Sequence, residues 1–322
     1  MKDFCVVGSG ISGSIVSNTL SKKYSIEIFE KSRGVGGRSS NRRFKNNLSF
    51  DHGLQYISPK SKNFKKFINL LEKKKIVKEW KGVHTDLFNS DLKIKKKKFI
   101  GNKGNNSISK YLTKKIKINF STTIKRANFK NKYWEIVTSD NKKIYFKNLI
   151  FSIPYPQIKK IVKKYLDKKI LNLNVKMKPN LTLMLIYKNC KKNSISSIKF
   201  NDKIISWASN ENSKLRFKSK LQLWTIQSNS QWSSVFINKY KKKKKLVINK
   251  MIDRFSKLSD YKNKNIIFQD IHGWKYSYNE KPTNIKSFWS KKYKLGLCGD
   301  WFLGPKAENA WESSVDLCKK IY

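Results

Sequence analysis

The first thirty residues contain two short apolar runs separated by one longer periodic run. Asp3 to Val7 is an apolar run of strand length, and Ser25 to Glu30 alternates apolar and polar residues and ends on a carboxylate. Between them, Ile11 to Leu20 places apolar residues at helical spacing. The order strand, helix, strand predicts a βαβ unit at the start of the chain.

Hydrophobic spacing predicts several further elements. Apolar positions at helical spacing predict helices over Phe64 to Ile76, from Asn105 to Leu112, and over Phe236 to Leu258. In the last of these, Val247, Met251, Phe255 and Leu258 share one face, and the five-lysine run 241–245 belongs to the solvated part. Strand patterns cover Ile116–Phe120, Tyr133–Thr138, Lys143–Phe151, Leu181–Tyr187 and Leu221–Gln227.

Three glycines follow the first predicted strand at the spacing of a dinucleotide-binding turn. Gly8 permits the tight turn, Gly10 lets the backbone approach a pyrophosphate, and Gly13 allows the helix to pack closely on the sheet. The helix that begins at Ile11 and Ser12 offers free N–H groups and a partial positive charge to phosphates. This motif indicates dinucleotide binding.

A second motif continues directly from the second predicted strand. Glu30 lies twenty residues after Gly10, where this fold places a carboxylate on the ribose hydroxyls of an adenosine, and it disfavours a 2′-phosphate there. It is followed by Lys31 and by a glycine-rich stretch that ends at Gly37 and Arg38. That stretch can wrap a cofactor, and the Arg38 guanidinium can bind a diphosphate.

Together these residues resemble the flavin-containing amine oxidase superfamily. Five further segments, over roughly residues 3 to 320, are similar to its renalase-like branch: Phe50-Asp51-His52-Gly53-Leu54-Gln55-Tyr56, Phe151-Ser152-Ile153-Pro154-Tyr155-Pro156-Gln157, the segment with Trp224 and Trp232, His272-Gly273-Trp274-Lys275-Tyr276, and Gly299-Asp300-Trp301-Phe302-Leu303-Gly304. The resemblance implies FAD as the cofactor. It also implies that Asp300 hydrogen-bonds the ribityl or diphosphate part, and that a helix beginning within Lys306–Val315 points its N-terminus at the pyrimidine ring.

The residues expected to bind FAD come from the motifs and the resemblance together. They are Gly8, Gly10, Ile11, Ser12, Gly13, Glu30, Lys31, Gly37, Arg38, Gln55, Gly299, Asp300, Ala307 and Ala310. The sequence departs from the family pattern at Ser313-Ser314, where Ser-Gly is usual, at Pro305-Lys306, and at Asn105, where Met is common. These departures affect the packing beside the flavin ring and the shape of the pocket.

The chain shows no internal repeat and no flexible linker, which fits two interleaved domains. The predicted fold is α/β, and α+β overall: a Rossmann-type FAD-binding domain with an interleaved substrate domain built on a largely antiparallel sheet plus helices. We expect residues 1–60, 100–157 and 285–322 in the FAD-binding domain, and residues 61–99 and 158–284 in the substrate domain.

The sequence contains no nucleophile elbow, no paired histidines and no defensible carboxylate pair, so it does not indicate a hydrolase. A substrate that gives a hydride to flavin N5 needs none of these groups. The resemblance implies oxidation of off-pathway dihydronicotinamide isomers of NAD(P)H to NAD(P)+, with electrons passing to molecular oxygen to give hydrogen peroxide. Tyr56, His272 and Trp274 are the pocket candidates, and no general base is assigned.

Two other functions remain open. The first is oxidation or desaturation of a small amine, for which Tyr56, Trp224, Trp232, Trp274 and Tyr276 would form an aromatic cage; each of them also fits a plain core residue, and His272 also fits a structural histidine. The second is a basic binding protein without enzymatic activity. The intact glycine motifs argue against the second.

Composition and charge change this interpretation little. The net charge of +51 comes mostly from lysines spread along the chain together with abundant Asn and Ile, as an A-rich coding sequence produces, so no specific nucleic acid is expected. No window has the length of a membrane span and no cleavage site follows the apolar N-terminus, so we expect a cytoplasmic protein without a membrane partner. Three histidines and four scattered cysteines predict no metal site, and the cysteines are expected to be reduced core thiols: Cys5, Cys190, Cys298 and Cys318.

Overall fold

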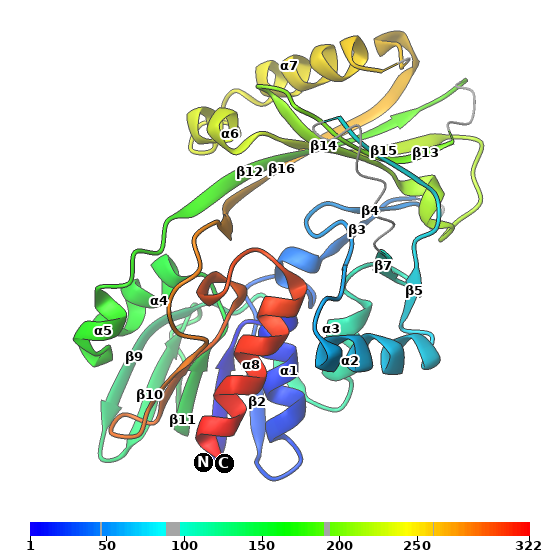
Figure 1. Ribbon diagram of the computed structural model, residues 1–322. Helices are drawn as coiled ribbons and strands as arrows, with labels where there is room; N and C mark the ends of the chain where they lie inside the picture. Colours follow the sequence, from blue (N-terminus) through cyan, green and yellow to red (C-terminus); the bar gives the residue numbers. More distant parts are fainter. Residues whose placement is uncertain (46, 88–96, 190–193, 260) are drawn as a thin grey trace.

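The computed structural model describes residues 1–45, 47–87, 97–189, 194–259 and 261–322. Two large sheets lie at opposite ends of the molecule, and both termini lie at the outer end of the larger one (Figure 1). We call the larger sheet with the helices that cover it the nucleotide half, and the six-stranded sheet at the other end the second sheet.

The larger sheet is built around β1. Its strands are β1 (Lys2–Val7), β2 (Ile26–Phe29), β8 (Lys117–Asn119), β9 (Ile124–Lys130), β10 (Tyr133–Thr138), β11 (Lys143–Phe151), β17 (Phe288–Ser290) and β18 (Leu295–Leu297). The order is β17-β18-β11-β1-β2-β8, with the antiparallel pair β10 and β9 continuing from β11. Strands β18, β11, β1, β2 and β8 run parallel, so their carboxyl ends meet at one edge, where such sheets bind ligands.

Helices cover both faces of this sheet. On one side, α1 (Ile11–Leu20) packs against α8 (Ala307–Ile321), with α3 (Ser107–Leu112) beside α1. On the other side, α4 (Tyr155–Val162) and α5 (Lys168–Leu171) pack with β9 and β10 into one apolar core. The sheet is therefore buried on both faces, as parallel strands require.

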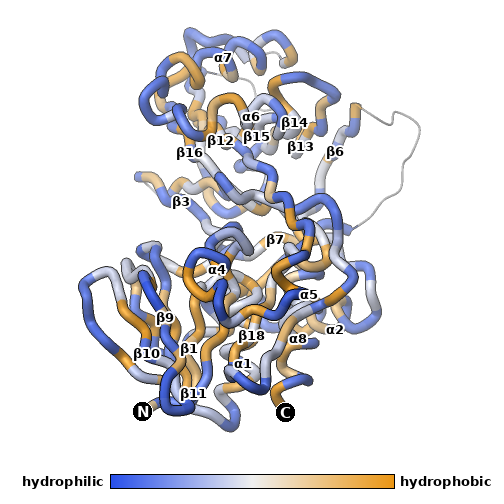
Figure 2. Tube along the Cα trace, turned by 90° about the vertical axis from the view of Figure 1, so that its left-hand side faces the viewer, coloured by the Kyte–Doolittle hydropathy of each residue, from blue (hydrophilic) through white to orange (hydrophobic). Residues whose placement is uncertain are grey.

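The second sheet has the order β16-β12-β15-β14-β13-β6. Its strands are β6 (Val83–Asp86), β12 (Met177–Tyr187), β13 (Ile195–Lys199), β14 (Ile205–Asn210), β15 (Gln222–Ser228) and β16 (Ile266–Asn279). All neighbours are antiparallel except β6 and β13. Helices α6 (Ser230–Phe236) and α7 (Lys244–Lys257) lie on its outer face, and Figure 2 shows long hydrophilic stretches along α7 and the segment before it.

A hairpin of the nucleotide half packs under the inner face of the second sheet. It consists of β3 (Asn41–Arg43) and β4 (Ser49–Asp51), and its Leu48 and Phe50 join Met184 and Leu223 in a small apolar core. A further pair, β5 (Val77–Glu79) and β7 (Phe99–Gly101), follows α2 (Lys62–Lys73). The hairpin and this pair connect the two ends of the molecule.

The predicted βαβ unit, the helices over α2 and α3, and all five predicted strands are present. The strands that were not predicted are β3 to β7, β9, β13, β14, β16, β17 and β18. The single helix expected over Phe236 to Leu258 is wrong, because a turn occupies residues 237–243 and α7 begins at Lys244. Two forces explain the break: Ile237 and Tyr240 pack against Gly273, and five successive lysines repel one another in a continuous helix.

Two segments expected in the substrate domain pack in the nucleotide half. Helix α2, within 61–99, contributes Phe64 and Ile68 to a core shared with Ile15 of α1 and Ala307 of α8. The expected boundary at residue 158 lies inside α4, which packs with α5 on the larger sheet.

Three cysteines are buried free thiols, in accord with their expected core positions: Cys5, Cys298 and Cys318. Burial raises the pKa of Cys318 to about 12. Cys190 lies outside the described residues. Across the described parts of the chain, no helix combines the length and the apolar character that crossing a membrane requires.

Candidate functional site

A cavity of about 1890 Å³ lies between the two sheets. Its wall includes the carboxyl ends of β1, β2 and β11, the glycine-rich segment 34–37, the start of α8 and parts of β14, β15 and β16. This volume exceeds the 300–1,000 Å³ typical of pockets for one small ligand. The cavity therefore has room for a dinucleotide and a second molecule.

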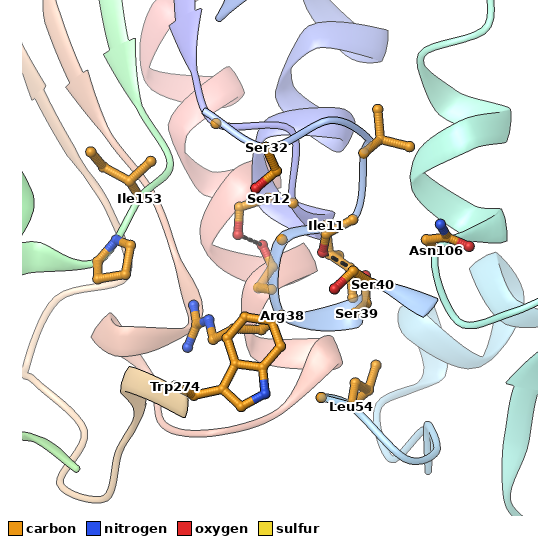
Figure 3. A pocket seen from close by; sticks show the side chains of 18 of the residues that line it. Ile11, Ser12, Ser32, Arg38, Ser39, Ser40, Leu54, Asn106, Ile153 and Trp274 are labelled. Atoms are coloured by element: carbon orange, nitrogen blue, oxygen red, sulfur yellow. Dashed lines mark hydrogen bonds between the residues drawn. The ribbon is translucent and has the colours of Figure 1, made fainter. Parts of the chain in front are cut away.

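The glycine turn has the geometry that its sequence predicts. Gly8 has φ +100°, which favours glycine, and a Cβ on Gly13 would lie 2.0 Å from the Gly8 carbonyl oxygen. A Cβ on Gly10 would lie 3.8 Å from the Gly36 carbonyl oxygen, an ordinary van der Waals distance, and Gly10 itself lines the cavity. No side chain caps the N-terminus of α1, and Ile11 and Ser12 line the cavity (Figure 3).

Glu30 is buried at the end of β2 and is anchored by the protein itself. Its Oε2 accepts hydrogen bonds from the Ser9 backbone N–H at 2.9 Å and the Ser9 hydroxyl at 2.8 Å, and its Oε1 accepts from the Ser32 N–H at 2.8 Å. A carboxylate has about four lone-pair sites, so a ribose hydroxyl can still donate to it. The carboxylate fixes the glycine turn to the loop that contains Lys31, which also lines the cavity.

Arg38 and Asp300, both expected at the cofactor, are paired with each other. The Arg38 Nη1 and Nη2 atoms donate to the Asp300 carboxylate at 2.9 and 2.6 Å, and Nη1 also donates to the Ser277 carbonyl at 2.8 Å. These three bonds leave two of the five guanidinium N–H groups without a partner among the described residues. Arg38 therefore fastens the glycine-rich segment to the C-terminal segment and retains donors for a phosphate.

The start of α8 forms another part of the wall. Ala307 and Ala310 line the cavity, and the helix begins without a side-chain cap. The serine pair that departs from the family pattern has a role here: the Ser313 hydroxyl accepts from the Gly299 N–H at 2.9 Å, and the Ser314 hydroxyl donates to the Ala310 carbonyl. Ser12 also donates to the Ala310 carbonyl, which ties α1 to α8.

Aromatic side chains line the second-sheet end of the cavity, but they are not the full set considered from the sequence. Tyr56, Trp274 and Tyr276 are present, together with Trp207, which the sequence did not single out. Trp207 lies on β14, a strand that hydrophobic spacing did not reveal. The cage interpretation of the other two tryptophans is wrong: Trp224 is fully buried in the core under α7, and Trp232 packs against Phe236.

His52, His272 and Trp274 form one cluster on the cavity wall. The ring centroids of His52 and His272 are 4.9 Å apart, and that of Trp274 is 4.3 Å from His272 and 5.3 Å from His52. The Trp274 Nε1 donates to the His52 carbonyl at 2.8 Å. Burial first, and then neighbouring positive charge, lowers the pKa of each histidine to about 4, so both rings are neutral at pH 7.

Behind Gln55 and Tyr56 lies a group of buried charges that the sequence did not reveal. We call Asp51, Glu211, Lys214 and Arg216 the ion cluster. The Lys214 Nζ lies 3.0 Å from Asp51 and 2.9 Å from Glu211, and the Arg216 Nη1 lies 2.5 Å from Asp51. Gln55 belongs to the same network, because its Oε1 accepts from the Ser209 hydroxyl at 2.7 Å.

The two carboxyl groups of the ion cluster have pKa values shifted in opposite directions. Burial alone would raise the pKa of Asp51, but Arg216 and Lys214 lower it below its usual range. Burial raises the pKa of Glu211, although Lys214 opposes this. The cluster joins the hairpin of the nucleotide half to the second sheet, and it supports the chain segment that carries Gln55 and Tyr56. No pattern in a chain so rich in lysine distinguishes Lys214 as buried.

Comparison with known proteins agrees with this architecture. The profile of a family described as NAD(P)-binding Rossmann-like domain matches residues 6–71. A candidate protoporphyrinogen oxidase from Exiguobacterium sp. 255-15 superimposes with a TM-score of 0.74 at 10% identity, covering 99% of this chain and 98% of that chain. An oxidoreductase from Methanosarcina mazei has a TM-score of 0.69 at 11% identity, covering 98% and 100%.

Putrescine oxidase with putrescine bound is also similar, with a TM-score of 0.66 at 9% identity, covering 99% of this chain and 98% of that chain. At these identities the likeness concerns the fold. The chain thus has a Rossmann-like dinucleotide-binding domain at its N-terminus, within a mixed α/β fold that it shares along almost its whole length with these three proteins.

Proposed function

We propose that this protein is an FAD-dependent oxidoreductase that oxidises a small molecule in the cavity between its two sheets. The observation that carries the proposal is the convergence of two uncapped helix N-termini, those of α1 and α8, on one cavity. Helix N-termini favour anionic groups through free N–H donors and the helix dipole. A dinucleotide suits both helix N-termini, because its diphosphate can lie at one and its electron-accepting ring at the other.

The residues that line the cavity suit FAD along its length. Glu30 offers a carboxylate for the adenosine ribose, and the turn at Gly10 lines the cavity where the diphosphate would lie. Arg38 has two remaining N–H donors near the middle, and Ala307 begins the helix at the far end. When bound, FAD accepts two electrons from the substrate and passes them to an acceptor such as molecular oxygen.

The chain itself supplies binding, orientation and electrostatics. The N-terminus of α8 favours negative charge on a ring placed before it. Tyr56, Trp207 and Trp274 provide flat apolar surfaces on which a planar substrate ring can stack. His52 and His272 are neutral, so neither places a fixed positive charge in the pocket.

For the substrate, we propose a dihydronicotinamide isomer of NAD(P)H, in keeping with the renalase-like motifs. A substrate that becomes aromatic on oxidation needs no strong general base, and the aromatic wall suits a planar ring. Oxidation of a small amine is the second candidate. It is favoured by the structural similarity to putrescine oxidase.

Two measurements test these proposals. The purified protein is expected to show flavin absorbance and to release FAD on denaturation, and a colourless protein that cannot be reconstituted would contradict the cofactor. Anaerobic mixing with 2- or 6-dihydroNAD is expected to bleach the flavin within seconds, much faster than NADH or putrescine. Rapid bleaching by putrescine alone would establish the amine candidate in its place.

A further inference from the structure

We propose that Arg42, His52 and His272 form an anion subsite that binds a phosphate or carboxylate group of the substrate. The three residues line the same cavity, next to Trp274. The inference rests on the proposed function, because it concerns the substrate of that cavity. It narrows the substrate to molecules that carry an anionic group.

The two histidines have hydrogen-bonding capacity that the protein does not use. Neither ring nitrogen of His272 has a hydrogen-bond partner within the ranges that the structure describes. His52 is 7% exposed, and its Nδ1 is sealed from solvent beside the Phe50 backbone, without a hydrogen-bond partner of normal geometry among the described residues. The His52 Nε2 makes one long contact, at 3.4 Å, with the Ser40 hydroxyl.

The His272 ring is half-buried on the cavity wall, so its two unpartnered nitrogens are available to a polar ligand bound there. A neutral imidazole donates one N–H and accepts at its other nitrogen. The two imidazoles come from different chain segments, with centroids 4.9 Å apart and an interplanar angle of 81°, so a group bound beside His272 would also lie near His52. A planar apolar ligand would leave these nitrogens without partners.

The charges around the two rings are positive on balance. Asp270, beside His272, is shared by two cations: Arg42 at 2.7 Å and Lys244 at 2.8 Å. Lys31 and Lys241 also disfavour protonation of His272, and Arg42 disfavours protonation of both rings. Asp51, the acid next to His52, already pairs with Lys214 and Arg216.

The excess of positive charge around the two rings favours binding of an anion and disfavours binding of a cation. A protonated amine near His272 would be repelled by Arg42, and the neighbouring carboxylate of Asp270 already has two cationic partners. An anion would attract Arg42 and would also stabilise the protonated form of each histidine, raising their pKa from about 4. Binding of the anion is therefore coupled to proton uptake and strengthens as the pH falls.

The test uses the FAD-loaded protein and two pairs of pyridine compounds. Nicotinamide mononucleotide has a phosphate that nicotinamide riboside lacks. Nicotinic acid has a carboxylate where nicotinamide has an amide. Affinity is measured by the perturbation of the flavin spectrum and by calorimetry in buffers of different ionisation enthalpy. We expect the mononucleotide to bind at least about tenfold more tightly than the riboside at pH 6, with proton uptake, and the ratio to narrow at pH 8. Nicotinic acid preferred over nicotinamide, with no phosphate preference, would assign the subsite to a carboxylate.

The variants His272→Phe and Arg42→Gln are expected to bring the affinity ratio close to one. His272→Phe keeps a ring against Trp274 and removes both nitrogens, and Arg42→Lys is expected to restore part of the preference. Lys250→Gln, which removes one exposed lysine of α7, is the matched control for lost charge and is expected to keep the ratio.

Equal affinities within both probe pairs in the unaltered protein would overturn the proposal, as would an anion preference that survives in both His272→Phe and Arg42→Gln. Absence of flavin would instead contradict the proposed cofactor. In that case calorimetry still measures probe binding, so the two failures can be told apart.

Discussion

The two ends of the cavity are built in different ways. At the nucleotide end, the wall includes the turn at Gly8 and Gly10, the segment around Gly36 and the uncapped start of α1, together with side chains such as that of Glu30. At the second-sheet end, the wall is made of side chains, among them Trp207, Trp274 and the two histidines. The first end has the features common to dinucleotide sites, with Glu30 disfavouring a 2′-phosphate, whereas the second end selects a substrate through the chemistry of other side chains.

The two ends also hold a buried carboxylate by different means. Glu30 is anchored by three hydrogen bonds from Ser9 and Ser32, which are its neighbours in the turn or the loop. Asp51 is held by Lys214 and Arg216, which lie 163 and 165 residues away in the sequence. Removing a neutral donor costs little compared with leaving a buried charge without its partner.

The largest effect is therefore expected in the ion cluster. Lys214→Ala leaves Asp51 and Glu211 with one cation between them, and it is expected to reduce the free energy of unfolding by about 3–5 kcal/mol. Urea denaturation followed by circular dichroism measures this loss. Lys286→Ala breaks an exposed pair with Glu312 and is expected to cost less than about 1 kcal/mol. Equal losses in the two variants would mean that the ion cluster does not support the junction.

The second expected effect concerns the glycine turn at the nucleotide end of the cavity. Gly13→Ala would place a Cβ 2.0 Å from the Gly8 carbonyl oxygen, so the helix or the turn must shift. We expect a stability loss of about 1–3 kcal/mol and poor retention of FAD, measured by thermal unfolding and by the flavin-to-protein absorbance ratio. Gly34→Ala is the matched control, because its Cβ would meet nothing within 4 Å. A yellow, stable Gly13→Ala protein would contradict the close packing.

The contrast between the two ends also explains which parts were predictable from the sequence. Gly8, Gly10, Gly13 and Glu30 lie within one βαβ unit, where spacing alone fixes their relation, and that unit is present as predicted. The pairing of Arg38 with Asp300 was not predicted, because the two residues are 262 positions apart and each was assigned separately to the cofactor.

At the second-sheet end, Tyr56, His272 and Trp274 were named from their motifs and line the cavity, but other residues there gave no local signal. The chain has 72 lysines and arginines, so the sequence does not distinguish the functional or buried cations Arg42, Lys214 and Arg216 from the rest. Trp207 lies on a strand that was not predicted, and Trp224 is a core residue even though its type suits a pocket. Only the tertiary arrangement of β14, β15 and β16 decides which aromatic residue reaches the cavity.

The third expected effect concerns the middle of the cavity, where the two ends meet. Arg38→Ala removes both the pair with Asp300 and the two remaining donors, and it is expected to weaken FAD binding by about 1.5–3 kcal/mol. Arg38→Lys keeps the charge but cannot donate to both carboxylate oxygens in a fork, so it is expected to recover only part of the affinity. Dissociation constants for FAD from fluorescence quenching measure both. An unchanged constant for Arg38→Ala would assign the arginine to the protein scaffold alone.

The smallest effect is a pH dependence that belongs to the second-sheet end. The pKa of His52 and of His272 is about 4 in the folded protein, against 6.5 for an unperturbed histidine. Between these values the unfolded chain binds protons that the folded protein does not, so the stability contributed by the neutral rings is complete above pH 6.5 and is lost as the pH falls towards 4. From pH 7 to 5.5 we expect a loss of about 1–2 kcal/mol from the pair, after allowance for the partial exposure of His272. The double variant His52→Phe/His272→Phe is expected to lose less stability over the same pH interval.

His84 is present in both the unaltered protein and the double variant, so the effect of its lowered pKa cancels when the two are compared. Urea denaturation at a series of pH values measures both slopes. Parallel slopes would mean that the two rings can take up protons in the folded protein as easily as in the unfolded chain, and the positive surroundings that we assign to the anion subsite would then be absent.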